Sequence, residues 1–243
     1  MMIYNLSNAD LAIGDGAASK KRAELVLEDK YKGITLHGRI RHKIKLSQPT
    51  RNSVYSCLFT RYGLDTGTEW QQEHFQSLFP KEVEVWAKAT ISNADKVHAA
   101  ALVEEDLQDH RDATFVRYLL LVDKMGHRRY VTPEFEPTEC FGRLKYILKF
   151  DLPAGITPLV TQTTTLVLAI IQSTEVVYET PLKIPYFDKF GRSEAVDMTT
   201  VMCIVGRVKD HRGRWAIVDR SELSSTRLWP VIQPLFARRR ASP

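Results

Sequence analysis

The sequence has no long hydrophobic run and no segment typical of export. Its longest uninterrupted aliphatic stretch, Leu166 to Ile171, has six residues, whereas a helix needs about 20 apolar residues to cross a bilayer. The first residues carry no early basic residue and no long apolar stretch, so no secretory signal is predicted. We therefore expect a protein with no membrane partner.

Cysteine is also scarce. The three cysteines, Cys57, Cys140 and Cys203, lie far apart, and an odd number cannot all pair within one chain. Reduced thiols that behave as small apolar residues are the simplest interpretation. They indicate an intracellular protein, nuclear or cytoplasmic.

Motifs for catalysis and cofactor binding are missing. The sequence contains no GxSxG, GxGxxG, P-loop or HExxH pattern and no Cys/His set at zinc spacing. We predict no enzyme activity, no cofactor and no metal site. The weak alternative of a metal-dependent nuclease depends on Asp15, followed by Glu24 and the Glu28-Asp-Lys30 triplet, although such sites usually carry an apolar residue where Asp29 stands.

The net charge of +5 is unevenly distributed. Residues 201–243 hold nine Lys or Arg against three acids. An opposite cluster of acids surrounds Arg111: Glu104, Glu105, Asp106, Asp109 and Asp112. This acidic run with His110 lacks the glycine and spacing of a calcium loop, which favours a solvated helix end. The basic C-terminal part is suited to a polyanionic partner.

The apolar fraction of 44% and the charged fraction of 26% are typical of a globular chain. Hydrophobic periodicity predicts strands over 23–27, 34–46, 54–60, 115–122 with 127–132, 141–150, 163–171, and 201–208 with 214–219. It predicts helices over 69–79 and 94–108, and a long loop around 181–191. The fold class expected is mainly β, barrel- or sandwich-like, with two short helices.

Four regions are expected along the chain. Residues 1–20 form a loose N-terminal leader, residues 21–110 a β-rich part with the two short helices, and residues 111–236 a β domain. Residues 237–243 form a basic tail containing Arg238, Arg239 and Arg240.

Three predicted strand faces carry one sign of charge. The alternation over 34–46 places Arg39, Arg41, Lys43 and Lys45 on one face above Ile40, Ile44 and Leu46. Similar basic positions recur at Arg143 and Lys145 and at Arg207, Lys209, Arg212 and Arg214. Such rows can track a phosphate backbone. They are equally typical of the solvated face of any antiparallel strand, and both interpretations stay open here.

The C-terminal 100 residues resemble a known class of sequences. The stretch Val196 to Val208, followed by Arg214-Trp-Ala-Ile-Val-Asp-Arg-Ser221, is similar to a segment of uncharacterised open reading frames in basidiomycete transposable elements. Residues 141–146 match the same pattern. The resemblance implies a mobile-element-derived region with a nuclear, DNA-linked role. The strand arrangement also resembles small chromatin-reader barrels such as the bromo-adjacent homology fold.

These observations favour a non-catalytic module that binds DNA, RNA or chromatin. The alternative is a protein–protein interaction or structural subunit that docks through its charged surfaces. The oligomeric state does not follow from the sequence.

Overall fold

The computed structural model describes residues 24–27, 29–39, 44–62, 69–92, 94–102, 112–125, 135–157, 159–179 and 184–219. This part of the chain is mainly β, with two short α-helices, as the sequence predicts. Its principal sheet has nine antiparallel strands that curl without closing into a barrel, and a second sheet has four. The predicted leader and basic tail lie outside the described residues.

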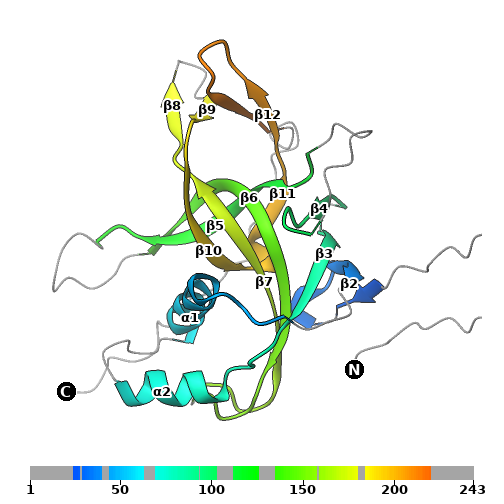
Figure 1. Cartoon of the computed structure of the whole chain (residues 1–243), viewed down its shortest axis with the longest axis vertical. Helices are drawn as coiled ribbons and strands as arrows, with labels where there is room; N and C mark the ends of the chain where they lie inside the picture. Colours follow the sequence, from blue (N-terminus) through cyan, green and yellow to red (C-terminus); the bar gives the residue numbers. More distant parts are fainter. Residues whose placement is uncertain are drawn as a thin grey trace, which may run out of the picture.

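The long strand β6 (Phe135–Leu152) is the central strand of the large sheet (Figure 1). Along one edge, its first half pairs with β5 (Phe115–Asp123) and its second half pairs with β3 (Glu84–Thr90). Its other edge pairs with β7 (Thr164–Thr174), which is apolar on both faces and buried from Leu166 to Ile171, as predicted. β7 pairs in turn with β10 (Phe190–Asp197).

The remaining strands of this sheet extend it at two places. β1 (Glu24–Val26) and β2 (Thr35–Arg39) continue from β3, while β4 (Lys96–His98) is a short partner of β3. β11 (Val201–Ile204) pairs with β5. Because β3 bonds to β6, residues on both sides of position 110 share one sheet. The 3₁₀ turns η1 (Asp29–Tyr31) and η2 (Met198–Thr200) follow β1 and β10.

The four-stranded sheet stands at one end of the molecule's long axis (Figure 1). Its order is β12 (Gly206–Lys209), β13 (Trp215–Val218), β9 (Ile184–Phe187) and β8 (Val177–Glu179). The predicted hairpin of 201–208 with 214–219 is therefore two units, since β11 joins the large sheet and β12 pairs with β13. The predicted loop around 181–191 instead contributes β9 and the start of β10.

Helices α1 (Gln48–Tyr62) and α2 (Glu69–Leu78) pack beside the second half of β6 and its neighbours. α2 confirms the predicted helix over 69–79. The strand predicted over 54–60 is wrong, because this segment lies within α1. Ser47 accepts the Thr50 N–H at the start of α1, and Pro49 falls in the first turn, where its missing N–H costs nothing.

Three apolar clusters hold the layers together. One fills the concave side of the large sheet around Leu36, Trp86 and Ile147. The second joins the helices to the opposite face, where the rings of Tyr55, Phe75, Phe79 and Phe150 contact one another. The third joins the two sheets: Phe115 of β5 stacks on Phe187 of β9, with ring centroids 5.3 Å apart.

Two further predictions of secondary structure need correction. The strand predicted over 34–46 is shorter, since β2 ends at Arg39 and Ile44 forms only an isolated bridge to Val83. Ile40 to Lys43 lie outside the described residues. The helix predicted over 94–108 is wrong where the structure describes it: Lys96–His98 is a strand, entered through a turn in which Ala94 has φ +69°. Residues 103–111 lie outside the described residues.

The hairpin predicted for 115–122 has a different partner. β5 pairs with residues 135–143 of β6, and residues 126–134 lie outside the described residues. The predicted single apolar face of 141–150 is also wrong. A register shift between Leu144 and Tyr146 places Leu144 in the concave core, whereas Leu148 and Phe150 face the helices.

Candidate nucleic-acid interface

The basic row predicted near the N-terminus is described by the structure only at its two ends. Arg39 is the last residue of β2, and Lys45 is exposed in the irregular segment between the Ile44 bridge and α1. Arg41 and Lys43 lie outside the described residues. The described part of the chain therefore supports no row of four residues here.

Two of the three basic residues of β6, Arg143 and Lys145, are half-buried. Arg143 lies opposite Phe115 and therefore on the same sheet face, at the joint between the two sheets. Lys145 lies at the register shift of β6. Its neighbour Lys149 is buried, with Nζ 3.7 Å from Glu84 Oε2. These residues do not form an exposed row.

The four C-terminal basic residues come together on the β12–β13 hairpin. The guanidinium of Arg207 lies between two rings, 4.3 Å from the centroid of Phe115 and 4.9 Å from that of Trp215. It also forms an ion pair with Asp112. Burial alone would raise the pKa of Asp112, but hydrogen bonds from Thr114 and the charge of Arg207 hold it below its usual range. Arg207 thus anchors the hairpin to the large sheet.

The turn of the hairpin is organised by Asp210. Its Oδ1 accepts hydrogen bonds from the backbone N–H groups of Arg212 and Arg214, at 2.8 and 2.9 Å. Its Oδ2 accepts hydrogen bonds from Nε and Nη2 of the Arg214 guanidinium, at 3.1 and 3.0 Å. Gly213 has φ +83°, a backbone conformation that favours glycine. The Arg214 guanidinium in turn lies 4.8 Å from the Tyr186 ring centroid. The turn is fixed by its own side chains.

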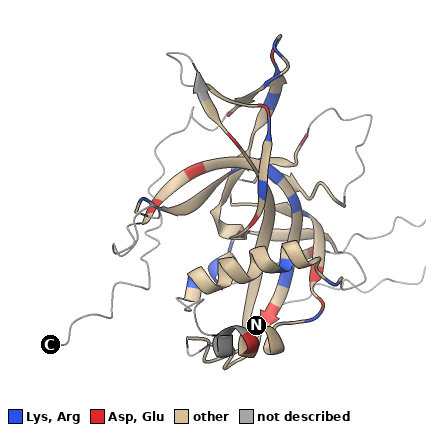
Figure 2. Cartoon of the chain, turned by 60° about the vertical axis from the view of Figure 1, so that its left-hand side comes forward, with Lys and Arg blue, Asp and Glu red and all other residues tan. Residues whose placement is uncertain are grey.

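Two cations remain available at the tip. Lys209 and Arg212 are exposed, and neither side chain has an ion pair within the part of the chain that the structure describes. Lys209 Nζ lies 5.8 Å from the centroid of the Trp215 ring. The only acid of the turn, Asp210, is engaged by Arg214. In Figure 2, Lys and Arg residues, drawn in blue, lie at the projecting end of the small sheet. The tip therefore carries excess positive charge.

The outer face of the small sheet is apolar. The register aligns one residue from each strand in a row: Val208, Ala216, Tyr186 and Val177. Val208 is 58% exposed, Val177 57% and Val218, on the same face, 43%. Three exposed valines on one sheet face are typical of a contact surface rather than of a solvated one.

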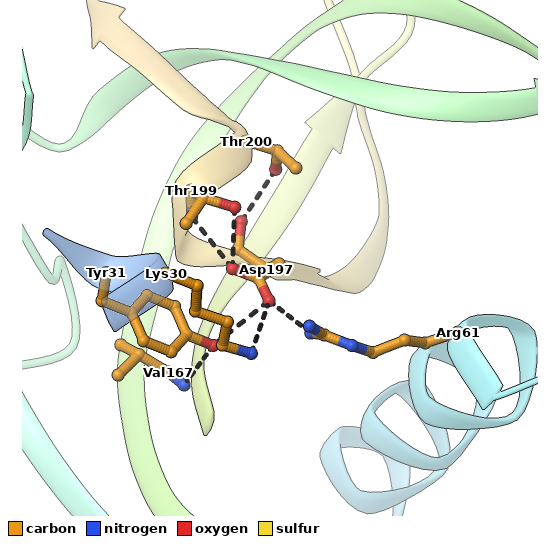
Figure 3. Close-up of polar contacts among 7 residues, drawn as sticks. All are labelled: Lys30, Tyr31, Arg61, Val167, Asp197, Thr199 and Thr200. Atoms are coloured by element: carbon orange, nitrogen blue, oxygen red, sulfur yellow. Dashed lines mark hydrogen bonds and ion pairs between the residues drawn. The ribbon is translucent and has the colours of Figure 1, made fainter. Parts of the chain in front are cut away.

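A second polar cluster surrounds Asp197 at the end of β10 (Figure 3). Its Oδ2 pairs with Arg61 of α1, accepts the Tyr31 hydroxyl at 3.1 Å and lies 3.6 Å from Lys30 Nζ. Its Oδ1 accepts the Thr199 N–H at 3.1 Å. The Tyr31 oxygen also accepts the Val167 N–H at 2.9 Å. Asp197 thus connects η1, α1 and η2, and Tyr31 extends the cluster to β7.

Burial and charge shift the pKa values of this cluster. Burial alone would raise the pKa of Asp197, but Lys30 and Arg61 hold it below the usual range. Burial lowers the pKa of Lys30 to about 8, although the negative charge of Asp197 acts to raise it. Burial also raises the pKa of the Cys57 thiol to about 11. Sequence reasoning missed this cluster, since its only local signal is the Asp-x-Thr turn at Asp197.

The nuclease constellation has no support from the described residues. Lys30 pairs with Asp197, Glu24 is exposed on β1, and Asp15 and Glu28 lie outside the described residues. Within the described ranges, no three His, Cys, Asp or Glu residues gather at metal-binding distance. No helix in this part of the chain has the length and apolar character needed to cross a membrane. Comparisons with family models, curated proteins and solved structures found no match.

Proposed function

We propose that this protein is a non-catalytic nucleic-acid-binding module whose contact element is the β12–β13 hairpin. The observation that carries the proposal is that two basic residues of the hairpin are engaged in internal contacts and two are exposed. Arg207 and Arg214 hold its base and its turn, whereas Lys209 and Arg212 are exposed at the tip and form no ion pair with an acid among the described residues. Exposed cations on a rigid support are suited to phosphate contacts.

The sequence resemblance supports the same proposal. Residues 196–208 and 214–221, which resemble the transposable-element reading frames, flank the turn at 209–213 and include most of both strands of the hairpin. A mobile-element origin favours DNA, rather than another polyanion, as the ligand. It also favours a nuclear site of action. The chromatin-binding variant of the proposal uses the same hairpin on nucleosomal DNA.

Binding titrations with full-length protein test the proposal. Fluorescence anisotropy would measure affinity for single- and double-stranded DNA and RNA at several salt concentrations. We expect log affinity to fall linearly with log salt, and the double variant Lys209→Glu/Arg212→Glu to reduce the slope by about 2. The matched control is Lys81→Glu/Lys96→Glu, which reverses two exposed charges on other elements and should bind like wild type. Absence of binding, or equal loss in both variants, would refute the proposal.

A second candidate function is docking of a protein partner, and the exposed valine row of the small sheet favours it. The double variant Val177→Ser/Val208→Ser separates the two functions, because it removes apolar area without changing charge. If the tip alone contacts nucleic acid, this variant keeps the affinity and salt slope of wild type. A loss of nucleic-acid affinity would place the outer face in the same interface.

A further inference from the structure

We propose that the hairpin tip enters the major groove of duplex DNA, where Arg212 recognises a guanine and Lys209 contacts a phosphate. This inference rests on the proposed nucleic-acid-binding function and assigns its substrate class and its specificity-determining residue. It follows from the shape of the tip, from the way its turn is fixed and from the state of the neighbouring aromatic rings.

The tip is narrow enough for the groove. β9 ends at Phe187, which pairs with Trp215, and Trp215 pairs with Lys209, so the chain from Asp210 to Arg214 forms a narrow loop beyond the paired strands (Figure 1). Between two and three residues on each side of the apex, at about 3.3 Å each, give a projection of roughly 8 Å. The major groove is about 12 Å wide and 8.5 Å deep and accepts a two-stranded ribbon.

Arg212 is displayed at the apex in a fixed backbone. Asp210 accepts its N–H at 2.8 Å, and Gly213 accepts the left-handed turn that follows. The carboxylate that could have captured the Arg212 guanidinium is already occupied by Arg214. An exposed guanidinium presents a planar fork of donors that matches O6 and N7 of guanine, the commonest specific contact in the major groove.

Other nucleic acids fit the tip less well. Single strands are bound largely by stacking of bases on free aromatic faces. Near the tip, Arg207 covers a face of Trp215 and Arg214 covers a face of Tyr186. Duplex RNA has a deep, narrow major groove that side chains cannot read. Duplex DNA is the class that remains.

The test first uses full-length protein to select bound duplexes from a random 20-bp DNA pool. Each selected duplex is then synthesised again with 7-deazaguanine in place of guanine. This analogue lacks only the N7 acceptor. We expect wild type to bind the 7-deaza duplexes about tenfold more weakly, in line with the loss of one bidentate contact. Arg212→Ala, which removes the guanidinium, should bind both versions equally. Lys209→Ala should weaken both versions equally and reduce the salt slope by about 1.

Three results would overturn the inference without touching the proposed function: equal wild-type affinity for both versions, an unchanged preference in Arg212→Ala, or tighter binding to single strands or duplex RNA. Failure of wild type to bind any nucleic acid would refute the proposed function itself. Because Lys209 and Arg212 are exposed, both variants should unfold at the wild-type temperature.

Discussion

Replacing Asp197 with asparagine tests whether its polar cluster holds the fold together. The substitution keeps the size of the side chain and removes the charge shared by Arg61 and Lys30. Asparagine still accepts the Thr199 N–H, so the loss is confined to the two cations and to part of the Tyr31 contact. We expect a folded protein with lower stability.

The burial of the three ionic groups sets the magnitude. Loss of one partner from a fully buried ion pair costs about 3–5 kcal/mol. The Asp197 side chain is 15% exposed, whereas Lys30 is 35% and Arg61 32% exposed. Both cations can therefore regain water after the substitution, and we expect a cost of about 2 kcal/mol at pH 7.

The pH dependence of this cost has a definite sign. The pKa of Asp197 lies below its usual range in the folded protein, so its contribution is complete above about pH 4, the ordinary carboxyl value. The contribution is lost as the pH falls through the lowered pKa. The stability difference between wild type and Asp197→Asn should therefore shrink in acid.

Urea unfolding, followed by tryptophan fluorescence and far-ultraviolet circular dichroism, would measure the difference. The midpoint should fall without a change in the slope of the free energy against urea. Asp188→Asn is the control, because Asp188 is exposed and should stay within about 0.5 kcal/mol of wild type. An equally small effect of Asp197→Asn would show that the cluster does not stabilise the fold.

Two further predictions concern Lys30 and Gly142. Burial lowers the pKa of Lys30 from 10.5 to about 8 in the folded protein. Between pH 8 and pH 10.5, Lys30 is therefore protonated in the unfolded chain but largely deprotonated in the folded chain. Wild type should thus gain stability relative to Lys30→Met as the pH rises from 8 to 10, and a constant difference in urea unfolding would contradict this. A Cβ on Gly142 would lie 2.5 Å from the Gln172 carbonyl oxygen, so Gly142→Ala should cost about 1–3 kcal/mol in the same assay. At Gly206 the nearest atom is 3.6 Å away, and Gly206→Ala should show no comparable loss.

The sequence predicted those parts of the fold where periodicity and burial agree. β7 is apolar on both faces because it lies between β6 and β10 under two cores. α2 has a clear helical spacing of large apolar residues. In contrast, α1 contains many β-branched and aromatic residues, and its helical state depends on Val54 and Leu58 packing on the sheet. Local preference is overridden there by tertiary contacts.

The candidate site was predicted only in part. The basic residues of the hairpin were identified as one group, but periodicity could not show that Arg207 and Arg214 are held by Asp112 and Asp210. Of the basic row at 34–46, the described residues include only Arg39, at the end of β2, and Lys45, which lies outside any described strand, so the row itself stays a prediction. The Asp197 cluster joins residues up to 166 positions apart and has no counterpart in local sequence.

The central position of β6 has a consequence for how the chain folds during synthesis. β1 to β4 can pair with one another early, but the β3 ladder to β6 needs residues 147–149, and Tyr31 finds Asp197 only after β10 has been made. The N-terminal strands therefore leave the ribosome long before the rest of the large sheet can cover them, with the apolar faces of β2 and β3 exposed to other chains. Slow translation or chaperone binding before residue 150 should matter more to the yield of this protein than events after residue 200.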